Sequence, residues 1–190
     1  MSFIVLIAAS AGGIDPLRQI VAALPVPCEA SVFVVQHIGA HPSRLPALLA
    51  SVAGLPAVHA HDQAPIEAGH IYVAPPDHHM FLELGRIRVN RAPKVHYTRP
   101  AADPLFISAA EVYGDKVIGI VLSGGDGDGA AGVQAVTKHG GLALVQHPES
   151  AWADGMPRSA IAADHPTVLT VAQIAQRVRA LCSRRGAPPS

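Results

Sequence analysis

Three residues of this chain could together carry out nucleophilic catalysis, namely Ser10, His37 and Asp128. A serine hydroxyl becomes a nucleophile when an imidazole accepts its proton, and a carboxylate orients that imidazole and stabilises its charged form. Each of the three stands where an apolar run gives way to a turn. The pattern predicts a hydrolytic triad, although a serine in a glycine turn taken alone is more often only a turn.

The segment around Ser10 shows how such a serine would be positioned. An apolar, strand-length run over residues 3–9 ends at Ser10-Ala11-Gly12-Gly13, and a helical pattern follows from Pro16, with Asp15 expected as its N-cap. A serine at the carboxyl end of a parallel strand lies at the rim where open α/β sheets bind ligands. The helix N-terminus that follows supplies N–H groups and positive partial charge for an oxyanion.

Strand and helix signals alternate along the rest of the chain. Strands are expected at 31–35, 69–74, 117–123 and 142–145, and helices at 16–24, 42–53, 103–113, 130–139 and 171–182. Residues 79–84 and 86–89 flank Gly85 and could form a hairpin. This alternation predicts an α/β fold, a doubly wound and mostly parallel sheet with helices on both faces and an antiparallel hairpin. We expect one domain over residues 1–183 and a flexible tail over 184–190.

A parallel sheet would bring the three candidate residues together. All its strands present their carboxyl ends at one edge, so Ser10, His37 and Asp128 can converge although 27 and 91 residues separate successive members. Their order is Ser, His, Asp, whereas α/β-hydrolases have the order Ser, Asp, His and a Gly-x-Ser-x-Gly elbow. The sequence contains no such elbow and therefore does not predict an ordinary esterase of that fold.

Composition narrows the class of protein. Of 190 residues, 49% are hydrophobic and only 4% aromatic, a balance typical of sheets covered on both faces. Lys plus Arg and Asp plus Glu both number 14, so no global field indicates nucleic acid or an anionic membrane. The apolar start is too short to span a bilayer and lacks a basic flank, and the two cysteines are far apart in sequence. We expect a soluble, cytoplasmic protein without membrane insertion.

Some residues of the chain are also compatible with other kinds of site. Clusters that could bind a metal are Asp126 with Asp128, His59 with His61 and Asp62, and His78 with His79. The two aspartates lack further oxygen ligands, His59 and His61 stand in a Pro/Ala-rich loop, and most such histidine pairs are solvated, so we expect no metal. The Gly12-Gly13 pair lacks a dinucleotide fingerprint. Ser123 could be a second nucleophile, but a turn role fits its place better, and Trp152 could line a pocket or pack in the core.

Six segments, in order, resemble one known family. They are Ile7-Ala8-Ala9-Ser10-Ala11-Gly12-Gly13, Val35-Gln36-His37, the run 71–80 (IYVAPPDHHM), the run 99–106 (RPAADPLF), Gly119-Ile120-Val121-Leu122-Ser123-Gly124 with the run 128–132 (DGAAG), and the run 155–161 (GMPRSAI). Together they are similar to the catalytic domain of the CheB-type chemotaxis receptor methylesterases, the protein-glutamate methylesterases.

The resemblance implies roles for particular residues. Ser10 would be the nucleophile, His37 the general base and Asp128 the orienting acid. Backbone N–H groups of Ala11, Gly12 and Gly125 would hold the oxyanion and position the substrate. The implied reaction is hydrolysis of glutamate methyl esters through an acyl-serine, with glutamine deamidation through the same intermediate, and it needs no cofactor. The implied partners are the cytoplasmic helices of methyl-accepting chemoreceptors and a separate response-regulator receiver.

Three departures from the family pattern stand out. Ala11 replaces the usual threonine after the nucleophile, and a Gly-Gly-Asp-Gly loop stands where the family usually carries a methionine, a bulky residue or a threonine near Gly125. The chain also begins at the catalytic strand, so we expect no receiver domain in cis. The first two departures bear on substrate positioning and rate.

A basic strip offers a docking hypothesis. Residues 86–99 contain five cations and no carboxylate, and Arg88, Arg91 and Arg99 could steer the Glu-rich helices of a receptor. A solvated hairpin explains the same charges. Two other functions stay open on the sequence: a catalytically weak binding or scaffolding module in a signalling assembly, and a hydrolase of small esters on the same scaffold.

Overall fold

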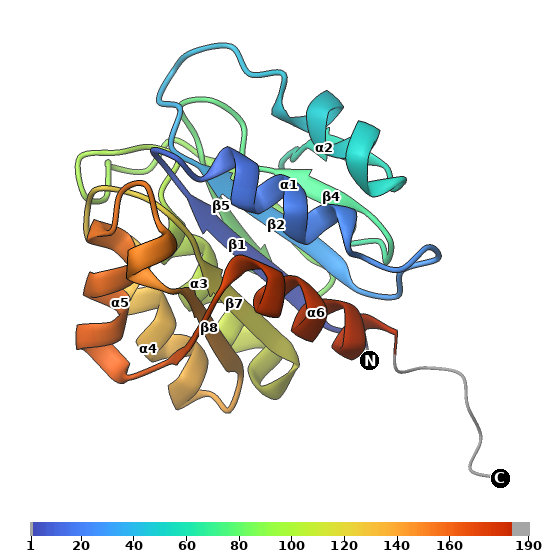
Figure 1. Cartoon of the computed structure of the whole chain (residues 1–190). Helices are drawn as coiled ribbons and strands as arrows, with labels where there is room; N and C mark the ends of the chain where they lie inside the picture. The colour runs from blue at the N-terminus through green and yellow to red at the C-terminus, as the bar shows by residue number, and fades with distance from the viewer. Residues whose placement is uncertain (1, 184–190) are drawn as a thin grey trace, which may run out of the picture.

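The computed structural model describes residues 2–183, which form a parallel sheet between two layers of helices (Figure 1). Seven strands make this sheet: β1 (Ile4–Ala9), β2 (Ser31–Gln36), β3 (Ala57–His59), β4 (Ile71–Val73), β7 (Val117–Val121), β8 (Leu142–Gln146) and β9 (Thr167–Leu169). Two more strands, β5 (His79–Glu83) and β6 (Arg86–Asn90), pair antiparallel as a separate hairpin. The predicted doubly wound α/β fold and its hairpin are confirmed.

Six α-helices connect the strands: α1 (Ile14–Ala22), α2 (Leu45–Ala53), α3 (Ala102–Tyr113), α4 (Ala130–Lys138), α5 (Gly155–Asp164) and α6 (Val171–Cys182), with short 3-10 turns at Gly114–Lys116 and Pro148–Ser150. No helix in the described range 2–183 is both long and apolar enough to cross a membrane.

The strand order is β3-β4-β2-β1-β7-β8-β9, with β1 in the middle. From β1 the chain builds outward through β2 to the β3 edge, then returns to place β7 on the other side of β1. The order therefore reverses between β1 and β7, the place at which doubly wound sheets bind their ligands. Ser10 follows β1, and Asp128 lies in the loop that follows β7.

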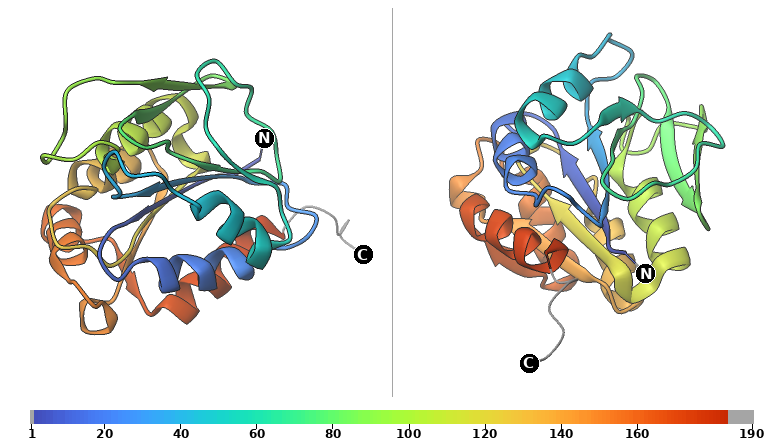
Figure 2. Two further views of the ribbon diagram at one scale, coloured as in Figure 1. Left: turned by 90° about the horizontal axis from the view of Figure 1, so that it is seen from above. Right: turned by 90° about the vertical axis from the view of Figure 1, so that its right-hand side faces the viewer.

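Both faces of the sheet are covered, which explains why its central strands β1 and β7 are apolar and buried along their whole length (Figure 1). On one face Val5 and Ile7 of β1 pack with residues of α1, α2 and α6. On the other face Leu6 and Ala8 pack with α3, α4, α5 and the hairpin. Figure 2 shows the hairpin on the α3 side, opposite α1, α2 and α6.

Three elements of the structure, β3, β9 and α5, are not predicted from the sequence, and each has a local reason. Strands β3 and β9 have three residues each and lie at the two edges of the sheet. Helix α5 begins Gly155-Met156-Pro157, a sequence of low helix propensity, and proline is tolerated there only because it stands in the first turn.

The expected N-cap of the first helix is wrong. Helix α1 begins at Ile14 with Gly13 as its N-cap, since the Leu17 N–H donates to the Gly13 carbonyl at 3.0 Å. Asp15 lies in the first turn, where its carboxylate pairs with Arg18 at 3.6 Å. The tail predicted over 184–190 lies outside the described residues.

Candidate active site

Ser10 is fixed by its backbone at the carboxyl edge of the sheet. Its N–H donates to the Ser123 carbonyl at 2.9 Å, which ties it to the end of β7. Its own carbonyl accepts from the Gly13 N–H and from Gln36 Nε2, both at 3.0 Å. Contacts with β7, β2 and the following turn therefore hold the backbone of this serine from three sides.

The turn after Ser10 requires its two glycines. Gly12 has φ +72°, and a Cβ there would lie 2.5 Å from Cβ of Trp152. A Cβ on Gly13 would lie 2.7 Å from Cβ of Ala9. Contacts below 3.0 Å exclude any larger side chain, so glycine lets the loop of Trp152 and helix α1 approach the serine closely.

A direct hydrogen bond joins the side chains of His37 and Asp128. His37 Nε2 donates to Asp128 Oδ2 at 2.7 Å, with the imidazole side chain 9% exposed and the carboxylate fully buried. His37 continues β2, and its N–H donates to the Ala9 carbonyl at 3.0 Å. Because Nε2 carries the proton toward Asp128, Nδ1 is left with the lone pair that a general base needs.

The charge of Asp128 is stabilised by the start of α3. Its carboxylate accepts from the Ala102 N–H at 2.6 Å and from the Asp103 N–H at 3.0 Å. Burial acts to raise the pKa of Asp128, but the hydrogen bonds from His37 and these two N–H groups outweigh it and lower that pKa. Asp128 is therefore an ionised, oriented partner for the imidazole.

Ser10 and His37 line the same pocket, a cavity of about 510 Å³ shared with Ala11, Gly12 and the start of α1. Within the described residues no hydrogen bond joins the Ser10 hydroxyl to His37, and Nδ1 lies 3.4 Å from Asp126 Oδ2. Catalytic hydrogen bonds commonly close only around a substrate. The site thus holds the imidazole–carboxylate pair ready, with the serine beside it.

The N–H groups of Ala11, Gly12 and Gly125 have no hydrogen-bond partner in residues 2–183. Ala11 and Gly12 also line the pocket of Ser10, whereas its lining does not include Gly125. The turn before α1 therefore offers two free donors at the helix N-terminus, where an anion is stabilised.

Two residues left open by the sequence have definite places. Ser123 is fully buried, and its hydroxyl donates to the Ala11 carbonyl at 2.7 Å and accepts from the Ala153 N–H at 2.9 Å. This is the turn role, since the hydroxyl clamps the nucleophile loop. Trp152 is 80% exposed and lies against Gly12, so it does not belong to the core.

The predicted docking arginines are not free cations. Arg88 pairs with Asp62 at 3.1 Å and with Glu83 at 3.0 Å. Arg99 pairs with Asp77 at 2.8 Å, and Arg91 pairs with the same carboxylate. Carboxylates from outside the strip fold back onto it, a feature that the local sequence could not reveal. A docking role for these residues stays a prediction.

Most of the histidines that are candidate metal ligands lie within hydrogen-bond distance of backbone carbonyls instead. His59, His78 and His79 lie within 3.3 Å of the carbonyls of Ser43, Pro76 and Pro93. Buried His79 also accepts from the Ala101 N–H, and burial lowers its pKa. In the described range one trio, His96, Asp103 and Asp128, has the spacing of metal ligands, but its carboxylate oxygens already accept hydrogen bonds.

Three further residues belong to the site and were not predicted. Gln36 binds the carbonyl of Ser10, Asp103 packs beside Asp128, and Asp126 faces His37. Gln36 and Asp103 stand inside the segments that resemble the methylesterases, so the segments pointed to them without showing their contacts. The sequence indicates Asp126 only as a candidate metal ligand, not as a neighbour of His37.

Comparison with known proteins agrees with this geometry. The family model described as CheB methylesterase matches residues 5–178. The crystal structure of the Thermotoga maritima CheB methylesterase catalytic domain superposes with a TM-score of 0.87 at 30% identity, covering 95% of this chain and 99% of that one.

Relatives are similar over most of this chain. A Pyrococcus horikoshii protein-glutamate methylesterase/protein-glutamine glutaminase is 39% identical over 162 residues, which cover 83% of this chain and 44% of that protein. A Leptospira interrogans protein, provisionally named for the same two activities, is 37% identical over 175 residues, which cover 90% of this chain and 91% of that protein. This chain thus spans under half of the Pyrococcus relative and nearly all of the Leptospira one. By sequence and by structure, the chain belongs to the CheB methylesterase family.

Proposed function

We propose that this protein is a serine hydrolase that removes methyl esters from glutamate side chains of chemoreceptors and deamidates glutamine through the same acyl-serine intermediate. The observation that carries the proposal is the 2.7 Å bond between His37 and buried Asp128 at the rim of the pocket that contains Ser10. Hydrolytic activity of this kind is the activity for which the relatives are named.

In the first step His37 Nδ1 accepts the proton of the Ser10 hydroxyl as Oγ attacks the carbonyl carbon of the methylated side chain. The negative charge moves to the carbonyl oxygen, which the N–H groups of Ala11 and Gly12 stabilise. One such donor accounts for about 10²–10³ in rate. The imidazolium, held by Asp128, returns the proton to the departing oxygen, and methanol leaves.

In the second step water replaces methanol. His37 accepts a proton from water as the oxygen attacks the acyl-serine, and collapse of the second tetrahedral intermediate releases glutamate and restores the Ser10 hydroxyl. With a glutamine side chain the first leaving group is ammonia, and the rest of the sequence is unchanged. Every step uses side chains and N–H groups of this chain.

The proposed partners are the cytoplasmic helices of a methyl-accepting receptor, and the proposed location is the cytoplasm. Regulation by a separate receiver protein belongs to the same proposal. Paired charges at Arg88, Arg91 and Arg99 weaken the field that reaches a docking helix, which makes the rim of the Ser10 pocket the better-supported contact.

The test is methanol release from a radiomethylated receptor preparation by wild type, Ser10→Ala and, as a matched control, Ser51→Ala at an exposed position of α2. We expect release by wild type and by the control, and none above background by Ser10→Ala. Turnover of p-nitrophenyl acetate without methanol release would favour a small-ester hydrolase. A folded wild type inactive in both assays would favour a binding module.

A further inference from the structure

We infer that His96 is a positioning residue of this active site, which acts through Asp103 on the loop that presents Asp128 to His37. The inference rests on the proposed function. Nothing in the sequence singles out His96, which stands in the loop between β6 and α3. Its imidazole Nε2 donates to Asp103 Oδ2 at 2.8 Å.

Asp103 links His96 to the loop of Asp128. Its Oδ1 accepts from the Gly129 N–H at 3.0 Å and from the Gly132 N–H at 2.8 Å, the residues around the start of α4. Its own N–H donates to Asp128 Oδ1 at 3.0 Å. Within residues 2–183, His96 is the one hydrogen-bond partner of Asp103 Oδ2.

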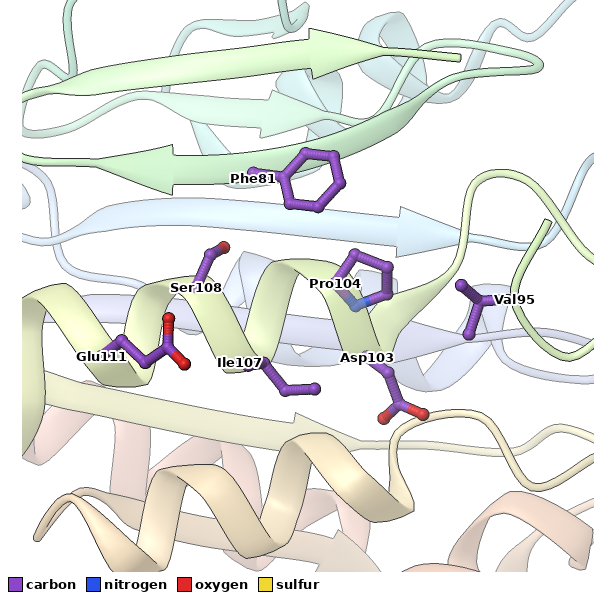
Figure 3. A pocket seen from close by; sticks show the side chains of 7 residues that line it. All are labelled: Phe81, Val95, Asp103, Pro104, Ile107, Ser108 and Glu111. Carbon is purple, nitrogen blue, oxygen red and sulfur yellow. The ribbon is translucent and has the colours of Figure 1, made fainter. Parts of the chain in front are cut away.

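The direction of the Asp103 side chain supports this role. A pocket of about 390 Å³ lies between β5 and α3, and Asp103 lines it together with Phe81, Pro104 and other residues. Figure 3 shows the Asp103 carboxylate pointing away from Phe81, toward the next helix. This direction agrees with the hydrogen bonds that the carboxylate accepts from the start of α4.

His96 can also supply positive charge next to two buried carboxylates. Asp103 and Asp128 are nearly fully buried, and one oxygen of each lies within 4.8 Å of the other and of a His96 nitrogen. Burial, and then the charge of Asp128, raise the pKa of Asp103 despite its hydrogen bonds. A protonated imidazole beside Asp103 offsets this repulsion, whereas a neutral one keeps the hydrogen bond but supplies no charge.

The groups that face His96 all favour its protonated form. They are Asp103 of α3 and, from the loop before α4, Asp126 and Asp128. Burial acts to lower the pKa of His96, but the hydrogen bond and charge of Asp103, with these two further carboxylates, raise that pKa overall. The charge balance of the carboxylate cluster therefore changes when pH rises through the raised pKa of His96.

The backbone at His96 is held in an unusual conformation. Val95 and Thr98 exchange two backbone hydrogen bonds around a two-residue turn, in which His96 and Tyr97 have φ of 50° and 61°. Glycine and asparagine usually occupy such positions. Tyr97 is 98% exposed, so its side chain does not anchor the turn. Strained non-glycine residues persist where the surroundings hold them, and here the bond to Asp103 does so.

The test uses two variants and one control. His96→Gln keeps a donor but carries no charge, and His96→Asn suits the turn conformation but is too short to reach Asp103. Tyr97→Ala, next to His96 on the same turn, is the control. The readouts are kcat and KM for methyl-ester hydrolysis across pH, and the low-field proton signal of His37 Nε2–H, identified by its loss in His37→Gln.

We expect kcat near neutral pH to fall about tenfold in His96→Asn and less in His96→Gln, with KM within twofold. Wild-type kcat should decline at alkaline pH toward the His96→Gln level, while His96→Gln shows no such decline. The His37 signal should broaden in both variants and stay unchanged in the control. Lower thermal stability with unchanged kcat, pH profile and signal would overturn the inference, leaving the proposed function standing. An inactive wild type removes the proposed function, and the His37 signal still decides the role of His96.

Discussion

Asp103 and Asp128 cap each other's helices. The carboxylate of Asp128 accepts N–H groups at the start of α3, the helix of Asp103, and the carboxylate of Asp103 accepts N–H groups at the start of α4, the helix that follows Asp128. Asp128, in the loop before α4, binds the first two N–H groups of α3. Asp103, in the first turn of α3, binds the Gly129 and Gly132 N–H groups at the start of α4. The exchange joins two helices that are separate in sequence, so the carboxylate proposed to orient His37 also caps the N-terminus of α3.

Asp128→Asn should reduce kcat by about 10³–10⁴, because an amide at this place favours the wrong imidazole tautomer. The comparison variant is Asp126→Asn, the same change two residues earlier, at a carboxylate that is 38% exposed, lies 3.4 Å from His37 Nδ1 and accepts the Asp128 N–H at 3.0 Å. We expect kcat of Asp126→Asn to fall by less than about 2.5-fold, against the fall of about 10³–10⁴ in Asp128→Asn. Equal losses would show that Asp128 alone does not orient His37. Steady-state kinetics on a small methyl ester measure both.

The lowered pKa of Asp128 predicts a pH-dependent contribution to stability. A carboxyl group whose pKa is lower in the folded state stabilises the fold above its unfolded pKa of about 3.9, and this contribution is lost as pH falls through the folded value. The Tm difference between wild type and Asp128→Asn should therefore be full at pH 5 and above and shrink below about pH 4. A difference that stays constant down to pH 2 would contradict an ionised, stabilised Asp128.

Much of this site was predictable because parallel sheets have one carboxyl edge. The apolar runs fixed β1 and β2 to within a residue or two, and with them the places of Ser10 and His37. What the sequence could not show is pairing between side chains distant along the chain. Carboxylates at 62, 77 and 83 neutralise arginines that looked unpaired in their own segment, and His96 reaches Asp103 only because of its turn.

The missed helix has a comparable cause. In α5, glycine and proline contradict helix propensity, and long-range contacts decide the structure instead. The Met156 N–H donates to the Gly124 carbonyl at 2.8 Å, and the Gly124 N–H donates to the Ala153 carbonyl at 2.9 Å. Helix α5 is thus anchored on the loop that leads to Asp128, a contact that local periodicity does not encode.

Trp152→Ala should raise KM for the methylated receptor by about 3- to 30-fold and leave kcat and small-ester kinetics unchanged. The side chain is 80% exposed against the Gly12 turn, so a bound protein would cover apolar area that free solvent now contacts. Leu84→Ala, 72% exposed at the hairpin tip, is the control and should leave KM unchanged. Equal KM shifts in the two variants would remove a specific role for the tryptophan.

Arg91→Ala should raise KM for the receptor less than about threefold, because a partnered surface charge contributes little free energy. Arg91 is 62% exposed and pairs with Asp77, whose pKa is lowered first by Arg99 and then by Arg91. The salt dependence of KM should match that of wild type. A tenfold rise in KM that disappears at high salt would instead establish the docking strip predicted from the sequence.

Substitution by alanine should lower stability and activity at Gly124 and leave both nearly unchanged at the adjacent Gly125. A Cβ on Gly124 would lie 2.0 Å from Met156 Sδ and 2.9 Å from Cβ of Ser10, so Gly124→Ala must displace Ser10 or α5. We expect a loss of about 1–3 kcal/mol in the free energy of unfolding and at least a tenfold loss of kcat. A Cβ on Gly125 would meet no atom within 4 Å.

Gly125→Ala is therefore the matched control, and its Tm and kcat should stay close to those of wild type. Thermal unfolding followed by circular dichroism and initial rates on a methyl ester give both quantities for both variants. If Gly125→Ala lost activity as strongly as Gly124→Ala, the flexibility of the loop, and not the space beside Ser10, would govern the reaction.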